Sequence, residues 1–135
     1  MNVSLRIDHT AIVVRDLDTA LDRYRALLGT PIVEPIVVEE QRVRVAFLPL
    51  GDTNLELVEP TDSYTGVARF LERHGEGMHH VGVGVADIHG EIERLMKEGV
   101  RLIDRSPRQG PHGLIAFVHP SASGGVLIEL VQNDT

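Results

Sequence analysis

The alternation of apolar and polar positions predicts a strand followed by a helix near the start of the chain. Residues 7–14 alternate as in a strand, with His9 among small and apolar residues on one face. Residues 17–28 carry apolar side chains at helical spacing, after Asp16 as a plausible N-cap and before Gly29 as a stop. The branched face of the strand is therefore expected under the helix, and the face with His9 is left for another purpose.

The same pattern returns in the second half of the chain. Residues 78–95 repeat residues 7–24 at an offset of 71, and the Leu-Glu-Leu-Val around Glu56 returns at an offset of 73 as Ile-Glu-Leu-Val around Glu129. Further strands are expected near 43–48, 54–58, 101–103, 114–118 and 126–131, a second repeated helix over about 88–96, and a short helix at about 64–74. Each half therefore reads as a strand, a helix and several strands, which is an α+β class of fold.

The length and the charge restrict the class of protein. The chain has 135 residues and a net charge of −7, which argues against general nucleic-acid binding and against attachment to anionic membranes. It contains no cysteine, so disulfides, thiolate zinc sites and a cysteine nucleophile are excluded. No apolar run reaches the length of a membrane span, and no signal-peptide pattern opens the sequence, so a cytoplasmic location is expected.

Four residues recur at strand positions of the repeat, namely His9, Glu56, His80 and Glu129. Each one alone is an ordinary core histidine or solvated glutamate. A carboxylate among apolar strands is costly to bury, however, and two imidazoles with two carboxylates balance the charge of one divalent cation. If the two halves pack about a pseudo-two-fold axis, the four side chains converge. Such nitrogen and oxygen ligands suit Zn, Co, Ni, Mn or Fe(II).

The chain resembles the vicinal-oxygen-chelate superfamily over essentially its whole length, and within it the methylmalonyl-CoA epimerases. The resemblance rests on Asp8-His9, on Glu56-Leu57, on Gly77-Met78-His79-His80-Val81, and on His119-Pro120 through Gly124-Gly125-Val126-Leu127-Ile128-Glu129-Leu130. It implies one domain over residues 1–135, in which two βαβββ modules related by a pseudo-two-fold axis form a cupped mixed sheet with helices outside. Module one would span about 5–60, the linking helix about 64–74, and module two about 77–132.

The resemblance also implies a site and a reaction. The four ligands would be His9, Glu56, His80 and Glu129, with His80 rather than His79 as the ligand of the histidine pair. The ion would be Co²⁺ first, with Mn²⁺, Ni²⁺, Zn²⁺ or Mg²⁺ as alternatives. The substrate would be an acyl-CoA, namely methylmalonyl-CoA, and the reaction would interconvert its 2R and 2S forms at C2. The protein would be a homodimer.

The catalytic bases are less directly indicated. Some epimerases of this kind carry glutamine at the position of Glu56 and a glutamate on the third strand, where this chain has Val45. Removal of the C2 proton would produce an enolate of the thioester. Because valine cannot move protons, we expect Glu56 and Glu129 to flank this enolate as two acid–base groups. Gln41, Arg44 and His112 are candidate substrate-binding residues.

Two other classes of protein remain open from the residues, a different metalloenzyme of the same fold and a non-catalytic binding module. In the first class, a glyoxalase I-type isomerase would use the same four ligands on a glutathione hemithioacetal. An Fe(II) dioxygenase would need two histidines and only one glutamate, which fits the chain less well. A non-catalytic small-molecule-binding protein of the same fold would need no metal, so the full ligand set argues against it.

Overall fold

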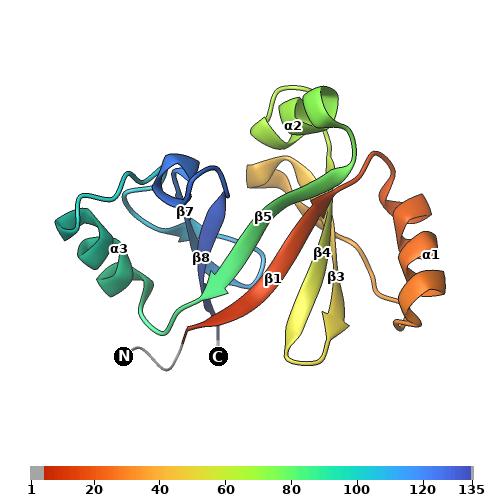
Figure 1. The fold of residues 1–135 in the computed structure, drawn as a ribbon. Coiled ribbons are helices and arrows are strands. Elements are labelled where there is room, and N and C mark those ends of the chain that lie inside the picture. Colours follow the sequence, from red (N-terminus) through yellow and green to blue (C-terminus); the bar gives the residue numbers. More distant parts are fainter. Residues whose placement is uncertain (1–4, 135) are drawn as a thin grey trace. The chain divides into compact units, whose positions relative to one another are not determined.

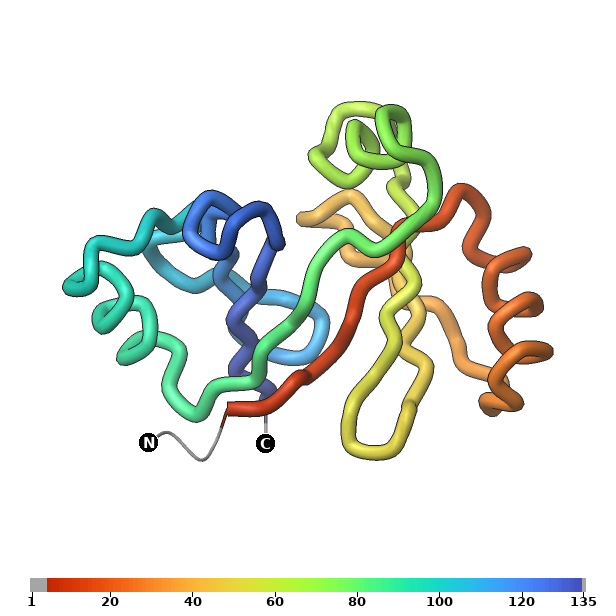
Figure 2. Tube along the Cα trace, viewed as in Figure 1, coloured from red at the N-terminus to blue at the C-terminus, as the bar shows by residue number. Residues whose placement is uncertain are grey.

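The computed structural model describes residues 5–134, so residues 1–4 and 135 of the expected domain lie outside the described part. The chain divides into two compact units, one formed by His9–His79 and the other by the described residues up to Asp8 together with those from His80 onwards. The unit boundaries fall inside the two strands that open the sequence repeat, β1 (Arg6–Val13) and β5 (Gly77–Gly84). Figure 1 labels most of the helices and strands, and Figure 2 follows the chain through them.

Module one consists of β1 and the four elements that follow it. These are α1 (Leu17–Leu28), β2 (Ile36–Val38), β3 (Val43–Leu50) and β4 (Thr53–Pro60), with a 3₁₀ helix at Glu39–Gln41 between β2 and β3. The strands lie in the order β2-β3-β4-β1. The β1–β4 pair is parallel and the other pairs are antiparallel, so the sheet is mixed. Helix α2 (Gly66–His74) follows β4 and leads to β5.

Helix α1 forms where the sequence predicts it. The side chain of Asp16 accepts a hydrogen bond from the backbone N–H of Asp18 and caps the first turn. Gly29 ends the helix with φ 67°, the left-handed conformation that glycine adopts without steric cost. The helix packs on the branched face of β1, as predicted, in a core of Val14, Leu17, Ala20, Leu21, Ala46, Leu48 and Leu57.

Module two repeats this plan with β5 and the elements after it. These are α3 (Ile88–Lys97), β6 (Arg108–Gln109), β7 (Gly113–Val118) and β8 (Ile128–Asn133), with a 3₁₀ helix at Pro120–Ser123. The strands lie in the order β5-β8-β7-β6, again with one parallel pair, β5–β8. Asp87 caps α3, and the helix covers a core of Val85, Ile88, Ile92, Ala116, Val118 and Leu130. Both modules confirm the α+β class and the mixed sheet with helices on one face.

The prediction of a strand at 101–103 is wrong, because this segment forms no strand. Leu102 makes only an isolated bridge with Val118, and the backbone N–H groups of Ile103 and Asp104 both donate to the carbonyl of Phe117. The carboxylate of Asp104 then accepts the N–H of Phe117, so a side chain replaces the ladder that a strand would continue. The short strands β2 and β6 were not predicted, because two or three residues carry no readable alternation.

No helix among residues 5–134 is long and apolar enough to cross a membrane.

Candidate active site

Module one buries a histidine beside a glutamate. Strands β1 and β4 are parallel, and their register places Glu56 opposite Ala11, two residues beyond His9 on the same face. The His9 Nε2 and Glu56 Oε1 atoms lie 3.5 Å apart. Only 4% of His9 and 7% of Glu56 is exposed. An ionised carboxylate at this depth needs compensating partners, because water no longer solvates it.

Module two builds the same pair at the same register. Glu129 on β8 lies opposite Gly82 on β5, two residues beyond His80. The distance between His80 Nε2 and Glu129 Oε1 is 3.6 Å, and both residues are as buried as their counterparts in module one. The sequence repeat is therefore also a repeat of buried chemistry, reached through two equivalent parallel strand pairs.

The spacing within each pair suits a shared cation. A separation of 3.5 to 3.6 Å is longer than a good hydrogen bond between nitrogen and oxygen. Two ligands each about 2.1 Å from one ion, at tetrahedral or octahedral angles, lie about 3.0 to 3.4 Å apart. The imidazole and carboxylate of each pair thus need shifts of only a few tenths of an ångström to hold the same ion.

A phenylalanine accompanies each pair, which the sequence reasoning missed. Phe47 lies opposite Glu56 in the β3–β4 register, and Phe117 lies opposite Glu129 in the β7–β8 register. The His9 and Phe47 rings meet at 89° with centroids 6.3 Å apart, and the His80 and Phe117 rings at 88° and 5.3 Å. The available signal was the dipeptide Ala-Phe, which recurs at an offset of 70 as residues 46–47 and 116–117.

The two adjacent histidines of β5 contact different partners. His80 meets Phe117 and Glu129, whereas His79 meets Phe70 of α2, with ring centroids 5.0 Å apart at an angle of 89°. His79 is only half-buried. This arrangement follows from the alternation of side chains along a strand. The role of His80 as the metal ligand of the pair stays a prediction.

Val45 occupies the site-bearing face of β3. It lies two residues before Phe47, and it is 1% exposed in a cluster with Ala11, Val43 and Val58. The third strand therefore supplies an apolar wall beside Glu56 and no acid–base group.

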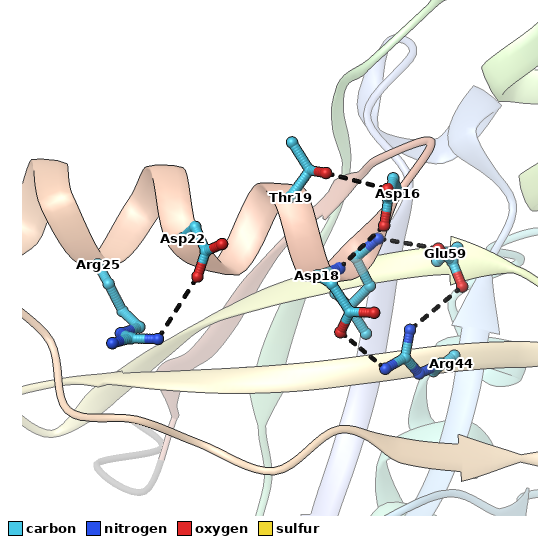
Figure 3. A network of polar contacts seen from close by, with 8 residues as sticks. Asp16, Asp18, Thr19, Asp22, Arg25, Arg44 and Glu59 are labelled. Carbon is cyan, nitrogen blue, oxygen red and sulfur yellow. Dashed lines mark hydrogen bonds and ion pairs between the residues drawn. The ribbon is translucent and has the colours of Figure 1, made fainter.

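Arg44 lies on the other face of β3, toward α1. Its guanidinium donates to Asp18 at 2.9 Å and lies 3.8 Å from Glu59. Figure 3 shows this network, in which Glu59 also accepts the backbone N–H of Leu17 at 2.8 Å. The hydrogen bond to Asp18 raises the pKa of Arg44 above its ordinary value. Arg44 thus holds the start of α1, and its predicted contact with substrate stays a prediction.

The other two candidate substrate-binding residues lie in connections between strands. Gln41 ends the 3₁₀ helix before β3, and its Nε2 is buried without a hydrogen-bond partner among residues 5–134. An amide donor left in this state costs roughly 1 to 3 kcal/mol, so a ligand that accepts its hydrogen bond gains that much in return. His112 is exposed in the loop between β6 and β7, where its carbonyl accepts the N–H of Asp134. Both substrate roles stay predictions.

Asp8 is a further buried carboxylate next to His9. It accepts hydrogen bonds from Asn133 Nδ2 at 2.6 Å and from Arg6 at 3.0 Å. These bonds fasten the start of β1 to the end of β8, which gives Asp8 a structural use.

Comparison with known proteins agrees with these features. The model of the Glyoxalase/Bleomycin resistance protein/Dioxygenase superfamily matches residues 8–119. The mitochondrial methylmalonyl-CoA epimerase of Bos taurus is 38% identical over 94% of this chain and 74% of its own. The ethylmalonyl-CoA/methylmalonyl-CoA epimerase of Cereibacter sphaeroides is 36% identical over 94% of this chain and 97% of its own. A structure of methylmalonyl-CoA epimerase in complex with methylmalonyl-CoA and NH₄⁺ has 39% identity and a TM-score of 0.90, covering 96% of this chain and 95% of that one.

The chain belongs to this superfamily and, within it, to the family of the methylmalonyl-CoA epimerases, which are enzymes of the isomerase class. The expected family is thereby confirmed.

Proposed function

We propose that this protein interconverts the 2R and 2S forms of methylmalonyl-CoA by moving the proton at C2. The observation that carries the proposal is the buried histidine–glutamate pair that each module builds at the same register. The relatives named above act on methylmalonyl-CoA, and one of them also on ethylmalonyl-CoA. An acyl-CoA with an acidic C2 proton and a free carboxylate is therefore the substrate class to test.

The proposed cofactor is one divalent cation held jointly by His9, Glu56, His80 and Glu129. Imidazole and carboxylate groups such as those of His9, Glu56 and His80 could hold a metal ion, and sulfur ligands are excluded because the chain has no cysteine. Two neutral imidazoles and two carboxylates with a divalent ion carry no net charge, which makes their burial affordable. Co²⁺ is the first candidate, ahead of Mn²⁺, Ni²⁺, Zn²⁺ and Mg²⁺.

The bound cation would stabilise the negative charge that develops on the thioester oxygen when C2 loses its proton. The residues of the chain would perform the proton transfers. The carboxylate of one glutamate takes the C2 proton, the C–H electron pair moves into the bond between C2 and the thioester carbon, and the carbonyl π pair moves onto the thioester oxygen. The other glutamate, in its protonated form, then donates a proton to the opposite face of C2, as the oxygen pair re-forms the carbonyl and the C2–carbon π pair makes the new C–H bond. Atoms and charge balance, and the product is the other epimer.

Glu56 and Glu129 are the residues proposed for these two roles. Val45 lines the same face as Glu56 but has no proton to exchange, so the apolar third strand supports assigning both roles to the two glutamates. After one turnover, the glutamate that took the proton is protonated and the one that gave its proton is ionised. Each glutamate would therefore act as the base in one direction of the reaction and as the acid in the other.

The deciding experiment is proton NMR of each pure epimer in D₂O with Co²⁺-loaded protein, using Glu56→Gln and Glu129→Gln. Both substitutions keep an oxygen ligand of nearly the same shape, so we expect the metal content, measured by mass spectrometry, to stay near one per chain. Epimerisation should slow by roughly a hundred- to ten-thousand-fold, as is typical for loss of one acid–base group. Each variant should still exchange the C2 proton of one epimer with deuterium, and the two variants should prefer opposite epimers.

Two results would contradict the proposal. Full epimerase activity in chelator-treated protein would exclude the four-ligand metal site. Epimerisation at the wild-type rate in metal-loaded Glu56→Gln would reduce Glu56 to a ligand and leave the second face of C2 to another group, for which Gln41 or His112 would be tested next.

The assembly and location are also proposals. A second copy of the chain is the proposed partner, in a homodimer, and the cytoplasm is the proposed location. Light scattering coupled to size-exclusion chromatography tests the assembly against the monomer mass of 14.9 kDa.

A further inference from the structure

The segment that runs from Ile103 into the first residue of β6, Arg108, holds Phe117 by its backbone and by its ring. Asp104 accepts the N–H of Phe117 at 2.8 Å, while the carbonyl of Phe117 accepts the N–H groups of Ile103 and Asp104. The second carboxylate oxygen of Asp104 lies 3.2 Å from Nε of Arg108. The Arg108 guanidinium lies over the Phe117 ring, 5.7 Å from its centroid. We refer to Asp104, Arg108 and Phe117 as the clamp.

The clamp ends on a proposed metal ligand. The Phe117 ring also contacts the imidazole of His80, at 5.3 Å between centroids and nearly perpendicular, and Phe117 is the cross-strand neighbour of Glu129. Rotation of the His80 ring about its χ2 angle would drive it into Phe117, provided that Phe117 itself cannot move. Arg108 and Asp104 are placed to prevent that movement. The Arg108 guanidinium holds the Phe117 ring, and the Asp104 carboxylate holds the guanidinium.

Module one has an equivalent edge strand but no arginine at this position. There β2 pairs with the outer edge of β3 as β6 pairs with β7, and Ile36 lies opposite Val45 where module two has Arg108 opposite Ile115. Ile36 has no charge to place over Phe47. The His9 and Phe47 centroids are also 1.0 Å farther apart than those of His80 and Phe117, as 6.3 Å compares with 5.3 Å. The side-chain clamp is therefore a feature of module two that the sequence repeat does not explain.

We propose that Asp104 and Arg108 are positioning residues which, through Phe117, fix the imidazole of His80 in the orientation that binds the cation. The proposal rests on the metal site proposed above. In this proposal, the His80 imidazole beside Glu129 already has its metal-binding orientation before the metal binds. Partners outside the ligand shell that orient a metal-binding histidine typically change metal affinity by ten- to a hundredfold when they are removed.

The test uses Arg108→Met, which keeps the length of the side chain and removes its charge, and Arg108→Lys, which keeps the charge. Arg101→Met is the matched control, because Arg101 is an exposed arginine of the segment leading into the clamp. Phe117→Leu removes the ring itself, and Phe47→Leu is its counterpart in module one. Long-range ¹H–¹⁵N spectra of the imidazoles in metal-free protein at one fixed pH report the orientation of His80, with His9 as internal reference.

The expected result is that Arg108→Met and Phe117→Leu shift or broaden the His80 signals and leave those of His9 in place. Phe47→Leu should do the reverse, and Arg101→Met should change neither. Co²⁺ affinity, measured by competition with a chelator, should fall about tenfold in Arg108→Met and recover in part in Arg108→Lys. At saturating Co²⁺ the kcat of Arg108→Met should return close to that of the wild type.

Unchanged His80 signals in Arg108→Met would overturn the proposal. A raised KM for the acyl-CoA with unchanged His80 signals would also overturn it and would make Arg108 a substrate contact instead. Failure of the metal site itself would be seen separately, as a wild-type protein that neither binds Co²⁺ nor epimerises. The metal-free spectra would then still decide whether Arg108 orients His80.

Discussion

Module one and module two place a histidine, a glutamate and a phenylalanine at equivalent strand positions, yet they support these residues differently. In each module an edge strand pairs with the strand that carries the phenylalanine, β2 with β3 and β6 with β7. In module two, Arg108 of that edge strand and Asp104 before it also hold Phe117 with their side chains. The two modules therefore share the residues with site chemistry and differ in the side chains that support them.

The helix starts show the same division between what is retained and what is changed. Glu59 on β4 accepts the N–H of Leu17 at the start of α1, and Gln132 on β8 accepts the N–H of Ile88 at the start of α3, both at 2.8 Å. The position and the acceptor oxygen are the same, but only module one uses a charge. That charge also lies near Arg44, as Figure 3 shows. Equivalent geometry thus carries unequal electrostatics.

The largest expected effect tests whether both modules serve one site. His9→Ala and His80→Ala should each lower Co²⁺ affinity and epimerase activity by at least about a hundredfold, because either change removes a ligand. His79→Asn is the control, since His79 contacts Phe70 and should keep both properties. The measurements are metal content and epimerisation rate. Loss in only one of the two alanine variants would show that one module alone carries the site.

The next effect concerns a backbone position at which the modules differ. Gly113 lies opposite Asn133 at the start of β7, where module one has Val43 opposite Pro60. Gly113 has φ 151°, and an added Cβ would meet the carbonyl oxygen of Gln132 at about 2.1 Å. Gly113→Ala should therefore lower the free energy of unfolding by roughly 3 to 5 kcal/mol in urea titrations.

Gly124→Ala provides the control for strain without a clash. Gly124 has φ 76°, but nothing lies within 4 Å of its added Cβ. Gly124→Ala should lower the free energy of unfolding by only roughly 1 to 2 kcal/mol, the cost of the left-handed backbone alone. Equal losses at the two glycines would show that β7 moves aside, and that the close approach to β8 is not required.

A smaller effect sharpens the comparison of the helix starts. Glu59→Ala should cost about 2 kcal/mol of unfolding free energy, because it removes a charge-assisted hydrogen bond at a helix N-terminus. Gln132→Ala should cost about 1 kcal/mol, since its bond is between neutral groups. Raising the salt concentration should narrow the difference between the two variants. A greater loss for Gln132→Ala would contradict the electrostatic part of the argument.

The smallest effect is a pH dependence at the N-cap of α1. Hydrogen bonds with Thr19, first through its hydroxyl, lower the pKa of Asp16 below its ordinary value of 3.8. A lowered pKa in the folded state stabilises the protein above the unfolded value, and this contribution disappears as the pH falls through the folded value. Asp16→Asn should therefore flatten the decline of stability below about pH 4, as followed by urea midpoints. Asp87→Asn is the matched substitution at the N-cap of α3.

Much of the fold could be predicted because local rules and the repeat agree. Asp16, Gly29 and Asp87 act at the helix ends as their residue types indicate. The facing of His80 against His79 follows from alternation along one strand. The error at residues 101–103 has an equally physical origin, because the carboxylate of Asp104 takes the hydrogen bond that a strand backbone would make, and no apolar pattern records such a competition.

The sequence by itself determined the two modules, their helices and the identity of the four residues with ligand chemistry, because strand alternation, helix caps and an internal repeat are local properties. Only the tertiary structure decided how these residues are used. Strand register brought Glu56 to His9 and Glu129 to His80, turned Arg44 toward α1, and set Phe117 between Arg108 and His80. Pairings of this kind join residues far apart in the chain, so the free energy that selects them comes from packing the whole module.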